Sequence, residues 1–427
     1  MLGIVLGLIV LMILAYRGWS IIWVAPIASG IVALGGGLDL MDAYTSVYMS
    51  GFVAFAKTWF PVFMLGAIFG KLMEITAMAH SVSRSIGTIL GARRAILGVI
   101  LSAALLTYGG VSLFVVVFAV YPLALSLFRQ ADIPRRLIPA CIALGAFTFT
   151  MAAFPGSPQI QNLIPIKYFG TTSMAAPFMG LIAGLIMLFG GYFYLKYREN
   201  HLRSLGEHYD EPDEKHQAHS TEKTPPLALS LLPLLCVVLL LNVFSFSIIN
   251  ALLCGIFLIL ILNIHRFKTF VKAINDGATG SIIAIINTAA AVGFGSVAKA
   301  VPGFSTLSEW LLTLKINPLI SEAVAVNLLA GATGSASGGM GIALEALAEK
   351  YKELALSQNI SLELLHRVAS ISSGGLDALP HNGAVLTLLV ITGMSHKKSY
   401  LDLCVVAVII PIFALIVGII LAQFGIY

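Results

Sequence analysis

Long apolar runs separated by short polar stretches make up most of this chain of 427 residues. Runs such as 51–73 and 400–425 are long enough for a helix to cross a hydrocarbon core about 30 Å thick, since a helix rises about 1.5 Å per residue. Apolar residues make up 58% of the chain and charged residues 11%, which leaves too little polar surface to cover soluble domains. The sequence therefore predicts an all-α integral membrane protein.

The order of the apolar runs repeats once along the chain, with an offset of about 225 residues that is typical of an internal duplication. The runs fall at 2–16, 20–37, 51–73, 94–107 with 111–128, 136–170 and 173–196, and again at 227–242, 246–264, 280–300, 318–331 with 336–348, 363–393 and 400–425. We therefore expect a first transmembrane repeat at 1–195 and a second at 227–427. The charged segment between them, 196–226, is predicted to be a linker in water.

Each half contains one interrupted pair of runs whose pieces are short for a membrane span. The pieces 94–107 and 318–331 have about 14 residues each, against the roughly 20 that a span needs. If each pair is a re-entrant hairpin, each half crosses the membrane five times, and this odd number turns the second copy upside down. The sequence therefore predicts two inverted repeats with about 10 transmembrane helices, two re-entrant hairpins and two broken helices.

The positions of Lys and Arg orient this topology, because cytoplasmic loops carry an excess of both. Most of the 25 Lys and Arg residues fall on the side of the linker, and Arg367 is one of the few assigned to the opposite side. We expect a multi-pass protein of the cytoplasmic membrane, with the linker in the cytoplasm and both termini outside. The bilayer accounts for these charges, so nucleic acid is not expected as a partner.

Four clusters of Gly, Pro and polar residues interrupt the apolar runs at matched places in the two halves. Inside a bilayer such backbone is tolerated only within protein or beside a water-filled cavity. The candidate substrate-binding residues are Thr107, Tyr108, Gly109, Gly110 and Ser112 in the first hairpin tip, Pro155, Gly156, Ser157, Gln159, Gln161 and Asn162 in the first break, Thr333, Gly334, Ser335, Ser337, Gly338 and Gly339 in the second tip, and His381 and Asn382 in the second break.

A half-helix that starts inside the membrane presents unpaired N–H donors and the positive end of its dipole. Such a start is an anion site, so the four clusters favour a small carboxylate as substrate. Hydroxyl and amide side chains in the clusters are suited to bind substrate hydroxyl groups. The alternative is that these Gly and Pro residues only kink packed helices.

Asp377 and His381 are the ionisable residues placed most deeply in a break, and such groups within a membrane indicate function by default. Both are candidates for proton coupling. Asp377 is the better proton carrier, because a buried histidine tends to stay neutral. The alternatives are that Asp377 caps the following half-helix and that His381 is a packing residue.

Motifs for other chemistries are absent from the sequence. It has no GxxxxGK[ST] phosphate loop, no HExxH metal helix and no GxSxG elbow. Its four cysteines lie singly in apolar segments, without a CxxC pair for a metal or redox site. We therefore expect neither an enzyme nor a cofactor or metal.

The stretches LTYGGVSLFVVVFAVYPLALSLFRQADIPRRLIPA, from Leu106 to Ala140, and GSPQIQNLIPIKYFGTT, from Gly156 to Thr172, resemble the gluconate:proton symporter (GntP) family of the ion transporter superfamily. The likeness is to its 3-hydroxybutyrate permease-like branch. The resemblance implies a secondary carrier that moves small hydroxy-monocarboxylates with protons, as a possible homodimer. Pro155, Gly156 and Asn382 match the family pattern. The chain departs from the sugar-acid branch, which has a Glu near the first hairpin tip.

The resulting hypothesis is proton-coupled symport of a small hydroxy-monocarboxylate, with 3-hydroxybutyrate as the best candidate. Gluconate or another sugar acid is an alternative substrate. Sodium coupling is a second alternative, because half-helix C-terminal carbonyls at Thr107 or Gly331 are suited to bind Na⁺. A passive anion channel would use the same helix ends, although a TVGYG filter is absent.

Overall fold

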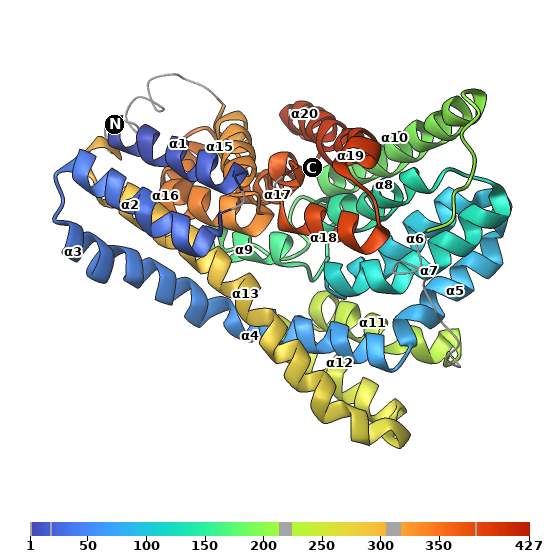
Figure 1. Ribbon diagram of the computed structural model, residues 1–427. Coiled ribbons are helices and arrows are strands. Elements are labelled where there is room, and N and C mark those ends of the chain that lie inside the picture. Colours follow the sequence, from blue (N-terminus) through green and yellow to red (C-terminus); the bar gives the residue numbers. More distant parts are fainter. Residues whose placement is uncertain (1, 18, 213–223, 305–316, 381) are drawn as a thin grey trace.

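A computed structural model describes residues 2–17, 19–212, 224–304, 317–380 and 382–427, and all regular elements in this part of the chain are helices (Figure 1). The predicted all-α fold is therefore confirmed. Within the described residues, five helical segments are long and apolar enough to cross a membrane: Leu40–Ile75, Arg135–Ala153, Pro177–Ser204, Ile264–Ala300 and His396–Gln423. Two bent pairs raise the number to seven if each is one span. The predicted total of about ten includes four shorter apolar helices and stays a prediction.

The first half begins with a helical pair, continues through a long helix and a hairpin to a broken helix, and ends in a second long helix. Its elements are α1 (Leu2–Tyr16), α2 (Ile21–Gly36), α3 (Leu40–Asp42), the π-helix η1 (Ala43–Tyr48), α4 (Met49–Ile75), α5 (Met78–Leu90), η2 (Ala92–Arg94), α6 (Ala95–Tyr108), α7 (Leu113–Ala131), η3 (Arg135–Leu137), α8 (Ile138–Ala143), the π-helix η4 (Leu144–Ala153), α9 (Ile160–Phe169) and α10 (Pro177–Ser204).

The second half follows the same order. Its elements are α11 (Leu227–Asn242), α12 (Ile248–Leu262), η6 (Ile264–Arg266), α13 (Phe267–Ala300), α15 (Pro318–Thr333), α16 (Ala336–Ser357), α17 (Leu362–Ser373), η7 (Leu376–Ala378), α18 (Gly383–Thr392), α19 (His396–Cys404), the π-helix η8 (Val405–Ile409) and α20 (Ile410–Gln423). The shared order supports a duplication. The inverted orientation of the second copy and the division at 195 and 227 stay predictions.

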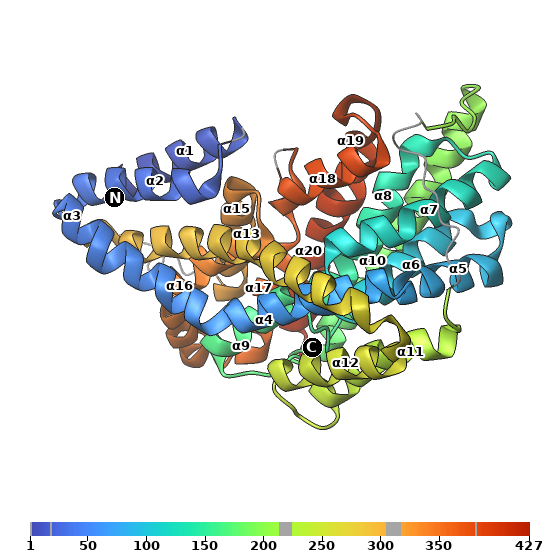
Figure 2. The same ribbon diagram turned by 60° about the horizontal axis from the view of Figure 1, so that its bottom comes forward.

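The long helices α4 and α13 lie side by side and join the halves (Figures 1 and 2). Gly277 on α13 makes this approach possible, because a Cβ atom there would lie 2.7 Å from the Cα of Ile68 on α4. Gly51 on α4 in turn faces Ser296 on α13. Small residues let helix backbones come close enough for extensive van der Waals contact in a membrane.

Both predicted hairpins and both predicted breaks are present. In the first hairpin, α6 and α7 are joined by a four-residue turn in which Gly110 has a φ of +93°, a conformation that favours glycine. In the second, α15 and α16 are joined through Gly334, with a φ of +59°. The first break lies between η4 and α9, and the second lies between α17 and α18.

One helix extends beyond its predicted end. The apolar run 173–196 becomes α10, which continues to Ser204 inside the segment predicted to be a linker. Lys196 and Arg203 both pair with Glu199 on this extension, at i,i+3 and i,i+4 spacings that stabilise a helix after the apolar pattern ends. Residues 213–223 of the predicted linker lie outside the described residues.

Candidate functional site

A cavity of about 410 Å³ lies between the two halves of the chain and is lined by both. Its walls come from the start of α2, from α4, α7, η4 and α9 in the first half, and from α13, the tip between α15 and α16, η7 and α18 in the second. Its polar lining residues are Ser20, Gln161, Asn287, Thr288, Thr333, Ser335, Ser337, Asp377 and Asn382.

Four of the helices that begin at this cavity each follow one of the four predicted clusters. The first residues of these helices, which all line the cavity, are Leu113 of α7, Ile160 of α9, Ala336 of α16 and Gly383 of α18. Since the first N–H groups of a helix have no partner within it, the cavity receives donors from four directions. This arrangement favours an anion.

Side-chain caps use some of these donors but not all. The hydroxyl of Ser335 accepts from the N–H of Gly338 at 3.1 Å, and Oδ1 of Asn382 accepts from the N–H groups of Ala384 and Val385 at 2.6 and 3.0 Å. The starts of α7 and α9 have no side-chain cap. Those two starts therefore keep N–H donors for a ligand.

Asp377 is the one charged residue among the described residues of the cavity wall. It lies in η7, is 5% exposed, and its Oδ1 has no hydrogen-bond partner in the part of the chain that the structure describes. Asn382, and not Asp377, caps α18, so the capping alternative for Asp377 is wrong. His381 lies outside the described residues, and neither of its predicted roles is tested.

The structure brings seven of the predicted site residues together at the cavity and places the other described ones elsewhere. The seven are Gln161, Thr333, Gly334, Ser335, Ser337, Asp377 and Asn382. The second half thus supplies most of them. Of the predicted site residues of the first break, only Gln161 reaches the cavity wall.

The rest of the first tip and first break form a hydrogen-bonded cluster beside the cavity. The hydroxyl of Tyr108 donates to the carbonyl of Pro155 at 2.8 Å, and Nε2 of Gln159 donates to the carbonyl of Thr107 at 2.6 Å. These bonds join the hairpin tip to the break. Ser112 precedes α7 as its N-cap residue.

The cluster continues through Ser157 and Asn162. The Ser157 hydroxyl donates to the carbonyl of Thr150 at 2.7 Å, while Nδ2 of Asn162 donates to the carbonyls of Ser157 and Ser173 at 2.9 Å each. Gly156 donates its N–H to the carbonyl of Ser173 at 2.9 Å. Hydrogen bonds therefore connect residues within the first break to one another and to the segment that precedes α10.

Four predicted glycines lie at close packing contacts instead of on the cavity wall. A Cβ atom on Gly109 would meet Leu234 at 2.6 Å, and one on Gly110 would meet Pro158 at 3.4 Å. In the second tip, Gly338 packs over Ser335, and Gly339 lies against the backbone of Ala330. These glycines shape the two hairpins.

The sequence analysis missed Asn287 and Thr288 of α13, which line the cavity. Thr288 Oγ1 lies 3.1 Å from Oγ of Ser337 and so connects α13 to the second tip. The available signal was an adjacent polar pair inside the apolar run 280–300, the type of feature that marks function in a membrane segment.

Arg367, which the sequence analysis counts on the side opposite the linker, does not lie in an exposed loop. Its side chain is fully buried, and it lies on α17 among carbonyls of the first break. The guanidinium donates to the carbonyls of Ala153, Ser173 and Ala175, at distances between 2.7 and 3.2 Å. A buried cation is stable only when hydrogen-bond acceptors compensate its charge, and these backbone carbonyls at the first break supply them.

The π-helix η4 leads into the first break and lines the cavity with Phe147 and Met151. Thr148 between them has φ −117° and ψ −107°, outside the helical region. The hydroxyl of Thr150 returns to the carbonyl of Gly145 at 2.6 Å, a five-residue spacing that follows the π-helical register. Such π-helical turns occur frequently at functional sites.

Apolar helices that are broken and paired around a polar cavity define a membrane transporter. A model of the GntP family permeases matches residues 1–250, more than half of the chain. The uncharacterized transporter YxjC of Bacillus subtilis strain 168 is 42% identical over 449 residues, with 95% of each chain covered. The chain belongs to the GntP permease family, as the resemblance implied.

A solved structure is similar in fold. The YdaH transporter of Alcanivorax borkumensis, described as having an unusual topology, aligns with a TM-score of 0.55 over 90% of this chain and 89% of that one, at 15% identity. The predicted membrane location therefore agrees with the family and with the fold.

Proposed function

We propose that this permease is a secondary active transporter that carries a small hydroxy-monocarboxylate together with a proton, and that 3-hydroxybutyrate is its best candidate substrate. The observation that carries the proposal is that the helix starts after all four predicted clusters meet at one cavity. The substrate carboxylate would accept from the uncapped N–H groups of α7 and α9. Its hydroxyl would bind to Gln161 or Ser337 on the cavity wall.

The size of the cavity supports a small substrate. Its volume of about 410 Å³ is near the lower end of the roughly 300–1,000 Å³ that small-molecule sites occupy. Because Lys and Arg are absent from its described lining residues, charge recognition would depend on helix starts. Recognition of charge by helix starts alone suits a substrate with one carboxylate group.

Asp377 is proposed as the proton carrier. A buried carboxyl group with an unpartnered oxygen on the wall of a substrate cavity is placed where it can exchange a proton with water that enters with the substrate. One proton per monoanion makes transport electroneutral. We further propose that the linker is cytoplasmic and both termini are outside, as the Lys and Arg distribution predicts.

Uptake of labelled 3-hydroxybutyrate into proteoliposomes tests the proposal. We expect an inward proton gradient to drive accumulation above equilibrium, with saturation and with competition by other short hydroxy acids. Accumulation that an inward sodium gradient drives without a proton gradient would show sodium coupling. Single-channel currents would show a passive channel. No uptake of 3-hydroxybutyrate, gluconate or their analogues under any gradient would reject the proposal.

A further inference from the structure

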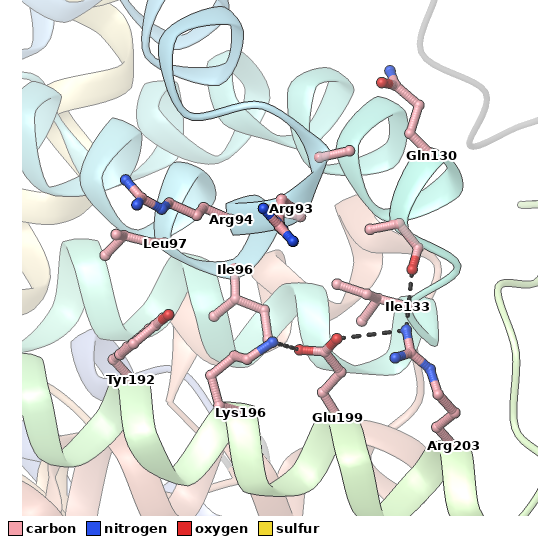
Figure 3. A pocket seen from close by; sticks show the side chains of 13 residues that line it. Arg93, Arg94, Ile96, Leu97, Gln130, Ile133, Tyr192, Lys196, Glu199 and Arg203 are labelled. Atoms are coloured by element: carbon pink, nitrogen blue, oxygen red, sulfur yellow. Dashed lines mark hydrogen bonds and ion pairs between the residues drawn. The ribbon is translucent and has the colours of Figure 1, made fainter.

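A second cavity, of about 360 Å³, lies where η2 meets α6, α7 ends, and the polar end of α10 passes (Figure 3). It shares no lining residue with the cavity between the two halves. Its wall carries the basic residues Arg93, Arg94, Lys196 and Arg203 and one acid, Glu199. Four positive charges against one negative charge leave a net charge of +3.

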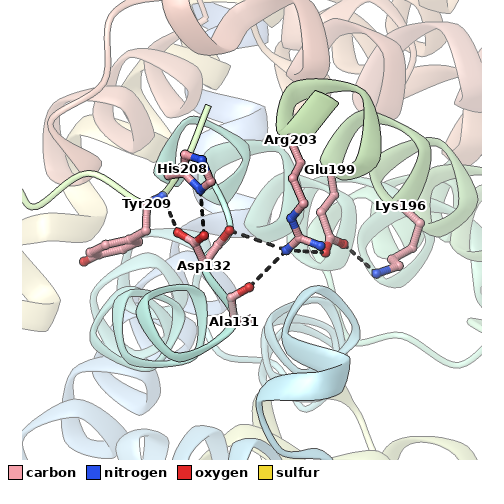
Figure 4. A network of polar contacts seen from close by, with 7 residues as sticks. All are labelled: Ala131, Asp132, Lys196, Glu199, Arg203, His208 and Tyr209. Carbon is pink, nitrogen blue, oxygen red and sulfur yellow. Dashed lines mark hydrogen bonds and ion pairs between the residues drawn. The ribbon is translucent and has the colours of Figure 1, made fainter. Parts of the chain in front are cut away.

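The basic residues of α10 are held in place by a buried acid. Glu199 is 4% exposed and accepts from Nζ of Lys196 at 2.6 Å, while Nη2 of Arg203 lies 3.5 Å from its other oxygen. Arg203 also donates to the carbonyl of Ala131, at the end of α7, at 3.1 Å (Figure 4). One wall of the cavity is therefore a fixed row of charged side chains.

The opposite wall carries two arginines without such a partner. Neither the Arg93 nor the Arg94 guanidinium forms an ion pair or hydrogen bond with any residue that the structure describes. Gly91, with a φ of +67°, turns the chain just before them. In Figure 3 the Arg93 side chain lies above the row formed by Lys196, Glu199 and Arg203, and the Arg94 side chain extends to one side of it, near Leu97. The start of α6 has no side-chain cap.

We propose that this cavity binds the phosphate group of an anionic ligand. An arginine fork matches two oxygens of a phosphate group, and two arginines line this cavity beside a Glu199 that is already paired. Arg93 and Arg94 are exposed, and Glu199 balances one of the four cations, so a phosphate with one or two negative charges would find a net positive site that is open to it. Neither the cavity between the two halves nor Asp377 takes part in this phosphate binding.

The phosphate group has two possible sources, which share this chemistry. The first is an anionic phospholipid, because α10 exposes Phe189, Phe193 and Tyr197 at 52%, 64% and 63% next to the cavity, and exposed aromatic rings are typical of the membrane interface. The second is a soluble phosphate compound that enters from the aqueous side. Lys and Arg near a membrane surface attract anionic lipids by about fivefold each.

Native mass spectrometry of the full-length protein in detergent tests the lipid source, with phosphatidylglycerol as the probe and zwitterionic phosphatidylethanolamine as the reference lipid. The test variant is R93Q/R94Q. The matched control is K397Q/K398Q, which removes an adjacent pair of exposed basic residues that does not line the cavity. We expect R93Q/R94Q to lower retention of phosphatidylglycerol at least roughly tenfold and the control to leave it unchanged.

Isothermal titration with inorganic phosphate tests the soluble source on the same three proteins. Binding of phosphate that disappears only in R93Q/R94Q, with equal lipid retention in all three, supports the site and assigns it to a soluble compound. Equal lipid retention together with no phosphate binding overturns the proposal. An equal loss of lipid retention or of phosphate binding in R93Q/R94Q and in the control also overturns the proposal, because the effect would then depend on surface charge alone.

Discussion

Nη1 of Arg367 on α17 donates a hydrogen bond of 2.9 Å to Oδ1 of Asn162 on α9, and so joins the second half of the chain to the first break. Both side chains are fully buried. Asn162 uses its amide nitrogen for two carbonyls of the first half, and its oxygen for this cation. The second half therefore supplies hydrogen bonds to the first break, which stabilise its interrupted backbone beside the cavity.

We expect R367A to destabilise the protein by about 3–5 kcal/mol, because it leaves several buried carbonyls without a donor. R367K keeps the charge but loses the planar fork, so it should fall between R367A and the unaltered protein. Tryptophan fluorescence during heating in detergent measures the melting temperature. R17A, at an exposed position, is the control. A melting temperature for R367A equal to that of the control would contradict the assigned role.

D377N should abolish proton-driven accumulation and spare exchange of labelled for unlabelled substrate. The amide keeps the size and polarity of the carboxyl group but carries no exchangeable acid proton. Accumulation and counterflow in the same proteoliposomes separate these two activities.

Glu322 supplies a matched control for Asp377. It is a fully buried acid whose carboxylate oxygens have no partner among the described residues, but it does not line the cavity between the two halves. E322Q should therefore keep gradient-driven uptake. Equal accumulation in D377N and E322Q would remove the role assigned to Asp377.

The sequence predicts the hairpins and breaks well, because clusters such as Gly109 to Ser112 and Pro155 to Gln159 cannot continue an apolar helix. It does not predict which polar side chain faces the cavity. Gln159 and Gln161 are two residues apart, and only Gln161 lines the wall, while Gln159 donates to the carbonyl of Thr107. Their directions depend on where α9 begins, at Ile160, a boundary that composition does not define.

Arg367 shows a different limit. It lies in the stretch Leu362 to Ser373, whose charged and polar residues are typical of a surface helix. The carbonyls that compensate its charge belong to residues more than 190 positions earlier in the chain. No local pattern contains that information, so only the tertiary structure assigns this residue to the interior.

G339A should destabilise the second hairpin. A Cβ atom there would lie 2.1 Å from the backbone nitrogen of Ala330, so α15 and α16 must separate, at a cost of about 1–3 kcal/mol or more. Gly66 on α4 has no atom within 4 Å of such a Cβ, and G66A should be neutral or stabilising by up to about 1 kcal/mol. Melting temperatures in detergent compare the two. The same sign of change in both variants would contradict the proposed packing.

Contacts of Asp132 should give the protein a pH-dependent stability. Nδ1 of His208 lies 2.7 Å from its Oδ2, and the N–H of Tyr209 donates to its Oδ1 at 3.1 Å (Figure 4). The His208 contact, followed by the Tyr209 N–H, lowers the pKa of Asp132 below its usual value. A lowered folded-state pKa means that this stabilisation is present above about pH 4 and is lost as the pH falls through the lowered value.

D132N measures this contribution. We expect its melting temperature to lie about one or two degrees below that of the unaltered protein at pH 7, since the group is exposed and its contacts are screened. The gap should close as the pH approaches 3. D42N, at another exposed aspartate, should show no such gap. A gap for D132N that is constant from pH 7 to pH 3 would contradict the assignment.

Gln161 offers the sharpest test of anion binding in the cavity. Its Oε1 has no partner among the described residues and its side chain lines the wall at the start of α9. Q161E keeps the shape of the side chain and adds a negative charge near the proposed carboxylate position, which should raise KM by at least roughly tenfold, since like charges brought together cost several kcal/mol. Q161A removes the amide without adding charge, so its KM should rise less. Q423E places the same charge at an exposed position on α20 and should leave KM unchanged. If KM rises equally in Q161A and Q161E, the cavity does not recognise substrate by its negative charge, and the helix starts do not hold a carboxylate.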